Sequence, residues 1–226
     1  MEVILKEFTL ELSSGFPLST DSMVLADFVK LPKNAAVLDL GSGCGTLGLL
    51  LCARDKSCTV TGVELDEAAH AAALENIARN RLEPRLSSIC GDLRTMPITP
   101  SGFQVCMSNP PYFSGGAVHS RNPVARSEET CTPGELFAAA AKALRYGGDF
   151  FLVHKPERLA QLCFEASSHA LEPKRLCLVR HRPDSPISLI LLACRKGGKP
   201  GLKIEELTLY NADGTPTADY KRIYHI

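Results

Sequence analysis

Apolar segments that alternately predict strand and helix run through most of this chain, and this alternation is what most constrains its fold. The first pair is Ala36–Leu40, typical of a buried strand, followed by an apolar helical segment at about 46–54. Strands that alternate with helices over short connections favour an α/β fold, here a mostly parallel seven-stranded sheet with helices on both faces. The six further predicted strands are 58–63, 86–90, 103–107, 150–153, 175–180 and 187–194.

Helix-capping residues indicate where three of the predicted helices begin. The segment Ser19–Asp21 offers three candidate N-caps for a helix at 22–29, and Asp66 is a candidate cap for an alanine-rich helix. The sequence Thr132–Glu135 matches a capping box with proline at the first helical position, and predicts a helix that continues to about Arg145.

The C-terminal part of the chain does not continue the alternation. Arg175–Arg180 and Ile187–Cys194 predict an antiparallel pair, and Leu202–Leu207 with the Asp213-Gly214 turn predicts a terminal hairpin. A chain of 226 residues with 45% hydrophobic content can bury one large core. We therefore expect one domain over 1–226, comprising an N-terminal arm and helix (1–34), a Rossmann-like core (35–194) and a C-terminal hairpin extension (195–226).

Cysteine usage and the N-terminal sequence indicate a cytoplasmic protein. The nine cysteines are scattered, lie mostly within apolar runs and include no C-x-x-C pair. We therefore expect reduced thiols, with neither a disulfide framework nor a metal site. No basic segment precedes a long apolar run at the N-terminus, and no apolar run approaches membrane-spanning length.

A glycine-rich turn follows the first predicted strand. Gly43–Gly48 matches the G-x-G-x-x-G fingerprint, and Glu64 lies 21 residues beyond Gly43, where a ribose-binding acid belongs. Such glycines let the backbone approach a ligand closely, and such an acid accepts hydrogen bonds from both ribose hydroxyls. Either a nicotinamide dinucleotide or S-adenosylmethionine would use these features.

Two further acids favour S-adenosylmethionine. Asp39 precedes the glycines inside the strand, and Asp92 ends the third strand. Because this cofactor has no phosphates and carries sulfonium and ammonium cations, an acidic rim suits it better than it suits a pyrophosphate. We expect Glu64 to bind the ribose, Asp92 the adenine amino group, and Asp39 with the glycine backbone the methionine end. The predicted cofactor-binding residues are Asp39, Gly41, Gly43, Gly45, Glu64, Asp92 and Asn109.

The hexapeptide Ser108–Phe113 follows the predicted strand at 103–107 and indicates the chemistry. Two consecutive prolines hold the chain extended without backbone N–H groups, so Asn109 and the Pro110 carbonyl form a fixed pair of acceptors. Tyr112 and Phe113 can lie against a flat ring, as aromatic side chains do with unstacked bases. We expect a planar substrate that carries an amino group. The predicted catalytic residues are Asn109, Pro110 and Tyr112.

Together, Val37–Gly45, Glu64, Asp92 and Asn109–Tyr112 resemble the class I S-adenosylmethionine-dependent methyltransferases that methylate amino groups. From about residue 15 to 210 the chain is similar to the bacterial tRNA adenine-N6 methyltransferases that modify valine tRNA beside the anticodon. The resemblance implies a Rossmann-like fold, S-adenosylmethionine as cofactor and N6-methylation of an adenine in tRNA. Further stretches that carry it are Leu18–Ser22, Ala125-Arg126, Val153–Leu159 and Leu171–Arg175.

Charge is unevenly distributed along a chain whose net charge is zero. Residues 1–141 hold 11 Lys+Arg and 16 Asp+Glu, whereas residues 142–226 hold 14 and 9. A basic C-terminal part fits contact with the phosphates of an RNA partner. The expected substrate-binding residues are Tyr112, Phe113, Arg121, Arg126, Lys155, Arg158, Lys174 and Arg175.

Three other functions are compatible with parts of the sequence. A protein glutamine N5-methyltransferase would present a carboxamide amino group to the same acceptors, although such enzymes carry a helical substrate domain before the catalytic one. A nicotinamide-dependent oxidoreductase would use the glycine fingerprint but leaves Asn109–Tyr112 unexplained. A non-catalytic RNA-binding module would not need the acids and acceptors that the chain retains.

Overall fold

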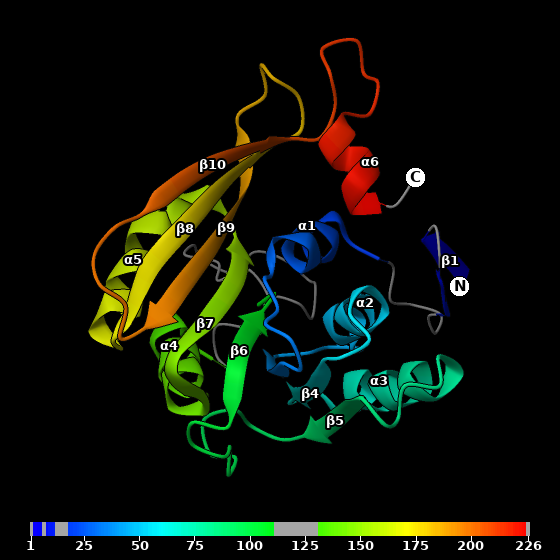
Figure 1. Ribbon diagram of the computed structural model, residues 1–226, viewed down its shortest axis with the longest axis vertical. Helices are drawn as coiled ribbons and strands as arrows, with labels where there is room; N and C mark the ends of the chain where they lie inside the picture. Colours follow the sequence, from blue (N-terminus) through cyan, green and yellow to red (C-terminus); the bar gives the residue numbers. More distant parts are fainter. Residues whose placement is uncertain (1, 6–7, 12–17, 111–130, 225–226) are drawn as a thin grey trace, which may run out of the picture.

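Eight strands, counted over the residues that the structure describes, form one sheet at the centre of the molecule (Figure 1). The computed structural model describes residues 2–5, 8–11, 18–110 and 131–224. The strands lie in the order β10-β8-β9-β7-β6-β3-β4-β5. Their bounds are β3 Ala36–Leu40, β4 Thr59–Glu64, β5 Leu86–Cys90, β6 Phe103–Ser108, β7 Leu144–His154, β8 Leu171–Arg180, β9 Ile187–Lys196 and β10 Lys203–Thr208.

Helices cover both faces of this sheet (Figure 1). One hydrophobic cluster packs α1, α2 and α3 with the C-terminal helix α6 against one face, and a second packs α4 and α5 against the other. Strand β7 contributes to both clusters, because its adjacent residues Phe150 and Phe151 point to opposite faces of the sheet. The rings of Phe28 and Phe151 meet edge-on at 5.9 Å, and those of Phe137 and Phe150 at 5.2 Å. The helix bounds are α1 Thr20–Phe28, α2 Thr46–Arg54, α3 Glu67–Arg79, α4 Pro133–Ala143, α5 Leu159–Ser168 and α6 Ala218–Tyr224.

The predicted α/β sheet is confirmed. The strands β3, β4, β5, β6 and β7 run parallel to one another, while β9 pairs antiparallel with both β7 and β8. All seven predicted strands are present. A separate two-stranded antiparallel sheet is formed by β1 (Glu2–Leu5) and β2 (Phe8–Glu11).

The prediction of a C-terminal hairpin is wrong about which strands pair. The segment Lys203–Thr208 is a strand, but it lies parallel to β8 at the sheet edge and so becomes an eighth strand. The predicted turn at Asp213-Gly214 closes only a single antiparallel bridge, between Tyr210 and Pro216. Proline has no N–H with which to continue that ladder, and the chain then enters α6.

Helix capping follows the predictions closely. Ser19 is the N-cap of α1, Asp66 is that of α3, and Thr132 with Glu135 forms the capping box of α4. The predicted end of α4 near Arg145 is wrong by two residues, because β7 begins directly at Leu144.

The nine cysteines differ greatly in exposure. All are free: six are buried, Cys131 and Cys163 are half-buried, and Cys90 at the end of β5 is exposed. Burial raises the pKa of the Cys131 and Cys177 thiols to about 11. Among the described residues, no three His, Cys, Asp or Glu side chains are grouped so that they could hold a metal ion.

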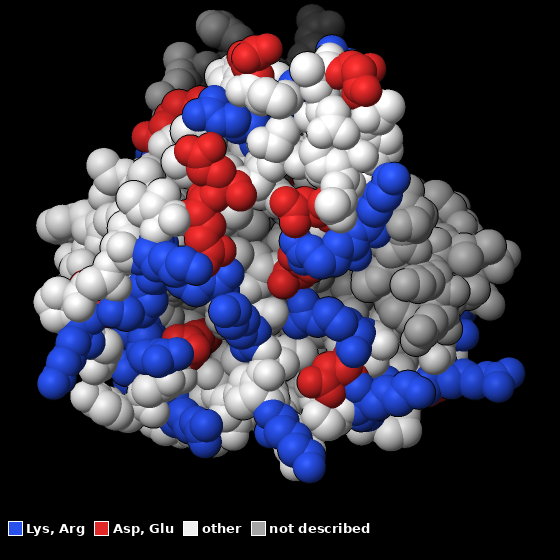
Figure 2. Space-filling view, turned by 45° about the horizontal axis from the view of Figure 1, so that its top comes forward, with Lys and Arg blue, Asp and Glu red and all other residues white. Residues whose placement is uncertain are grey.

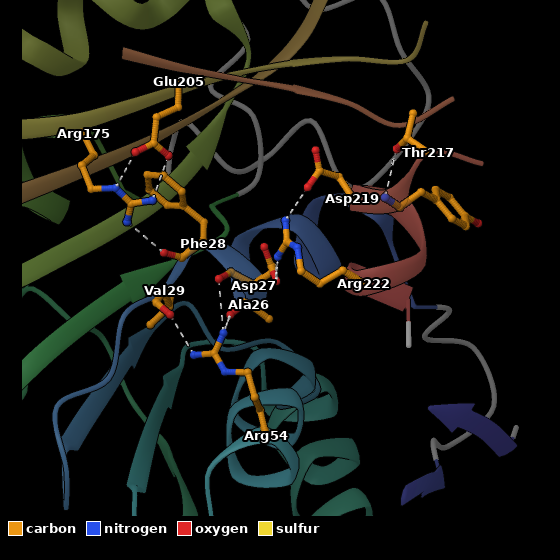
Figure 3. A network of polar contacts seen from close by, with 11 residues as sticks. Ala26, Asp27, Phe28, Val29, Arg54, Arg175, Glu205, Thr217, Asp219 and Arg222 are labelled. Carbon is orange, nitrogen blue, oxygen red and sulfur yellow. Dashed lines mark hydrogen bonds and ion pairs between the residues drawn. The ribbon is translucent and has the colours of Figure 1, made fainter. Parts of the chain in front are cut away.

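Three arginines from distant parts of the sequence hold α1 in place (Figure 3). Arg54, at the end of α2, donates to the carbonyls of Ala26, Asp27 and Val29, which lie at the C-terminal end of α1. Burial lowers the pKa of this guanidinium. Because the last carbonyls of a helix have no partner within the helix, Arg54 supplies donors that water would otherwise provide.

The other two arginines reach α1 from the C-terminal part of the chain. Arg175 on β8 pairs with Glu205 on β10, donates to the Phe28 carbonyl and lies 4.2 Å above the Phe28 ring. Arg222 on α6 forms an ion pair with Asp27. The C-terminal segment therefore takes part in fixing α1.

We expect Arg54→Met to lower the free energy of unfolding by about 2–3 kcal/mol, because it leaves several carbonyls without donors. Urea denaturation of the full chain measures this loss. Arg79→Met is the matched control, since Arg79 also ends a helix but pairs only with the exposed Glu75. The control should change stability by less than about 0.5 kcal/mol, and equal losses in both variants would contradict the role given to Arg54.

Candidate functional site

The register of the parallel strands brings the predicted site residues to one edge of the sheet. Asp39 on β3 is paired with Gly62 on one side and Met107 on the other. Glu64 ends β4 and is paired with Cys90, two residues before Asp92. Asn109 directly follows β6. Asp39, Glu64, Asp92 and Asn109 therefore all lie at or next to the carboxyl ends of four strands, where ligands bind in open α/β sheets.

The glycine-rich turn between β3 and α2 is folded for close approach of a ligand. Gly41, Gly43 and Gly45 have φ of 70°, 53° and 81°, which side chains strongly disfavour. A Cβ at Gly41 or Gly43 would meet no atom within 4 Å, so the space beside them is open. Position 48 requires glycine for a different reason. A Cβ there would lie 2.6 Å from the Leu86 side chain, so glycine allows α2 to pack on the sheet.

Glu64 fixes the shape of this turn. Its carboxylate accepts hydrogen bonds from the backbone N–H of Gly43, at 2.7 Å, and from that of Asp66, at 2.8 Å. A carboxylate has about four acceptor positions, so Glu64 retains capacity for a further donor. Leu65, which follows it, is 46% exposed, and sequence reasoning did not select it.

Asp39 is the most unusual group at this edge. Asp39 is 1% exposed, and neither of its carboxylate oxygens has a hydrogen-bond partner among the described residues; the buried Ser42 hydroxyl is also without one there. Desolvation by burial, and then the neighbouring charge of Glu64, raise the pKa of Asp39 to about 8. A buried carboxyl group without a partner is costly. A cationic ligand bound at the glycine turn would offset that cost.

Asp92 is already paired in this structure. The Arg94 side chain and backbone donate to its carboxylate, and these bonds hold the pKa of Asp92 below its usual range. Asp92 is therefore an ionised acceptor, but it shares its oxygens with Arg94. Sequence reasoning did not anticipate this partner two residues away.

Asn109 is held by a residue of α1 that is distant in sequence. Its Nδ2 donates to the hydroxyl of Ser22 in the first turn of α1, at 3.1 Å. The preceding Ser108 donates from its hydroxyl to the Leu40 carbonyl at 2.7 Å, which ties the end of β6 to the end of β3. Pro110, the next residue, is buried. Ser22 was not among the residues selected from the sequence, because its contact with Asn109 spans 87 positions.

Lys155 and Arg158 follow the end of β7, on the same edge. Arg158 donates to Gln161 at 2.7 Å. Burial raises the pKa of Asp21, at the start of α1, and the positive charge of Lys155 partly opposes this rise. The preceding residue, His154, is buried, and its Nδ1 accepts a hydrogen bond from the backbone N–H of Lys155. Burial lowers the pKa of this histidine.

Two other predicted substrate-binding residues, Lys174 and Arg175, are not brought to this edge. Arg175 lies within β8, where it contacts Glu205 and Phe28, and Lys174 donates to the Lys199 carbonyl. Both therefore support neighbouring segments. Tyr112, Phe113, Arg121 and Arg126 lie outside the described residues.

Comparison with known proteins assigns the chain to a family. The model of the methyltransferase small domain matches residues 17–168. The chain belongs to this methyltransferase family. It is 31% identical over 211 residues to the tRNA1(Val) (adenine(37)-N6)-methyltransferase of Serratia proteamaculans, which covers 90% of this chain and 80% of that relative. It is 30% identical to the enzyme of the same name from Photobacterium profundum, covering 79% and 77%.

Solved structures support the same fold. A predicted O-methyltransferase from Agrobacterium tumefaciens superposes with a TM-score of 0.76 at 19% identity, over 91% of this chain and 95% of that one. A geranyl diphosphate methyltransferase in complex with S-adenosylmethionine gives a TM-score of 0.59 at 13% identity, over 77% and 84%. The Rossmann-like class I methyltransferase fold is thus confirmed.

S-adenosylmethionine is the cofactor of this methyltransferase, and the residues at the sheet edge fit it. The unpartnered carboxyl of Asp39 suits a cation, and the open glycine turn admits the methionine end. Glu64 and Asp92 provide acceptors further along the edge. The glycine fingerprint alone was compatible with either a nicotinamide dinucleotide or S-adenosylmethionine, and the methyltransferase family decides for S-adenosylmethionine.

We expect cofactor binding to release a proton below pH 8. In the free protein the pKa of Asp39 is raised to about 8, so this carboxyl is mostly protonated at neutral pH. A bound cation favours the carboxylate and lowers that pKa, so the affinity should improve by up to about tenfold per pH unit and level off above pH 8. Calorimetry of S-adenosylmethionine binding in buffers of different ionisation enthalpy measures the released proton.

Asp39→Asn should bind weakly and without proton release across this range. Asp92→Asn is the matched control, because Asp92 is already ionised. It should weaken binding and leave proton release unchanged. Proton release that persists in Asp39→Asn would show that another group titrates.

Proposed function

We propose that this methyltransferase transfers a methyl group to N6 of an adenine in tRNA, near the anticodon. The observation that carries the proposal is the Asn109–Ser22 contact at the end of β6. When Nδ2 donates to Ser22, the Oδ1 of Asn109 is directed away from Ser22 and can accept from a substrate amino group. The names of the tRNA methyltransferases that resemble this chain support tRNA as substrate.

The proposed chemistry answers a specific difficulty. The amino nitrogen of adenine is a poor nucleophile, because its lone pair is delocalised into the ring. Two acceptors, Asn109 Oδ1 and the Pro110 carbonyl, favour a tetrahedral nitrogen and stabilise the positive charge that develops on it. Bound S-adenosylmethionine supplies the electrophilic methyl group. The alkylated nitrogen then loses a proton to water, so no strong base is needed.

Binding of the RNA would use aromatic and basic residues around this edge. We propose that Tyr112 and Phe113 stack on the target base after it leaves its own stack, which costs least in a loop. Lys155 and Arg158, with Arg121 and Arg126, would contact phosphates near the target base, and Lys174, which lies away from this edge, would contact a more distant phosphate. Figure 2 shows one face of the molecule on which Lys and Arg side chains gather mostly in the lower half, below a band of Asp and Glu. This uneven surface charge supports an anionic partner.

The proposed place of action is the cytoplasm, where tRNA is modified. Over the part of the chain that the structure describes, no helix is both long and apolar enough to cross a membrane.

Asn109→Ala should reduce methyl transfer by at least about 100-fold, while the Kd for S-adenosylmethionine stays within about threefold. The assay follows labelled methyl into unmodified bulk tRNA and identifies the product nucleoside as N6-methyladenosine. Asn211→Ala, in the turn after β10, is the matched control and should be fully active. Transfer by the unsubstituted protein to a protein glutamine, and not to tRNA, would replace the RNA proposal.

Replacing Lys155 and Arg158 with alanine should raise KM for tRNA with little effect on kcat. For each phosphate that is no longer bound, the slope of log KM against log salt concentration should also fall by about 1. Steady-state kinetics from low to moderate salt measure both effects. Arg79→Ala, on the exposed surface of α3, should leave the slope unchanged. An identical slope in the double variant would show that these residues do not contact phosphates.

A further inference from the structure

Ser22 is a buried hydroxyl that the reaction itself does not require. It is 7% exposed and lies in the first turn of α1, whose N-cap is Ser19. Its oxygen accepts two hydrogen bonds, each of 3.1 Å, from Nδ2 of Asn109 and from the Ser19 hydroxyl. Ser19 in turn accepts from the backbone N–H of Ser22 at 3.2 Å. The three side chains form a short chain that ends at the proposed catalytic amide.

The Ser22 oxygen acts as an acceptor in this arrangement. A hydroxyl has one proton to donate and two acceptor lone pairs. Ser19 and Asn109 both donate to the Ser22 oxygen. The NH2 end of the Asn109 amide therefore faces Ser22, and its carbonyl end faces away from Ser22.

The position of Ser22 is itself well determined. Arg54, Arg175 and Arg222 contact the C-terminal half of α1, and the Tyr224 hydroxyl donates to the Thr20 hydroxyl in its first turn at 3.1 Å (Figure 3 shows the three arginines). A helix fixed at both ends holds the Ser22 oxygen at a constant place relative to β6.

We propose that Ser22 is a positioning residue that selects the orientation of the Asn109 amide, so that Oδ1 and not Nδ2 faces the substrate amino group. The proposal rests on the proposed function, in which Asn109 accepts from that amino group. A rotated amide would present NH2 to NH2, two donors facing each other, and the acceptor that stabilises the transition state would be absent. Ser22 acts through Asn109 and need not touch the substrate.

Ser22→Ala tests this role. We expect kcat to fall about tenfold, roughly the effect of removing one hydrogen bond together with partial misorientation of the amide. The Kd for S-adenosylmethionine and the KM for tRNA should stay within about twofold. Ser22→Thr, which keeps the hydroxyl, should restore most of kcat. Melting temperatures of all variants identify any that fail to fold.

Thr20→Val is the matched control, since it removes a hydroxyl from the same helical turn and breaks the hydrogen bond with Tyr224 but not the one between Ser22 and Asn109. It should retain full kcat. A similar loss in Thr20→Val and Ser22→Ala would show that only the stability of α1 matters. An unchanged kcat in Ser22→Ala, or a loss confined to KM or to cofactor binding, would overturn the proposal.

A second readout does not depend on the substrate. The side-chain amide protons of Asn109, assigned by their absence in Asn109→Ala, should exchange with solvent at least several-fold faster in Ser22→Ala and at the normal rate in Thr20→Val. Unchanged exchange in Ser22→Ala would contradict the contact. Absence of methyl transfer to tRNA by the unsubstituted protein would instead refute the proposed function, and the exchange measurement would still decide whether Ser22 holds Asn109.

Discussion

The parallel pairing of β3 with β4 and β6 is the constraint on which the rest of this structure depends. Side chains alternate between the faces of a sheet, so a shift of one residue would turn Asp39 from the α1 and α2 face to the α4 face. The observed register instead places Asp39 opposite Gly62 and Met107. The glycine turn, Glu64 and Asn109 then reach the same edge without any further arrangement. The apolar strands determine the register, and the polar residues that end them form the site.

The site keeps a group that does not favour folding. Within the part of the chain that the structure describes, Asp39 is buried without a hydrogen-bond partner, next to the charge of Glu64. Stability is supplied elsewhere, through two hydrophobic cores and the arginines that fix α1. The helix α1 contributes both to stability and to the site. Its C-terminal end stabilises the fold, while its N-terminal end contacts Asn109.

Local sequence signals predicted the parts of the structure that depend on neighbouring residues. The capping residues Asp66 and Thr132 were predicted correctly because a cap acts within one helical turn. Strands such as β3 and β9 were predicted because their apolar runs are continuous and largely buried. The pairing of β10 was not predicted, because a strand can form a hairpin or join a distant edge with the same local sequence. The roles of Ser22 and Arg175 were likewise beyond local reasoning, since they depend on residues that are distant in sequence and face them in the folded chain.

The distribution of thiols gives this methyltransferase a natural reporter position. Six of the nine cysteines are buried, two are half-buried, and Cys90 is exposed. It ends β5, is paired in register with Glu64 and precedes Asp92 by two residues. A maleimide fluorophore would therefore attach first beside the predicted cofactor-binding residues. The fluorescence of a label on this native cysteine would then report ligand binding next to it.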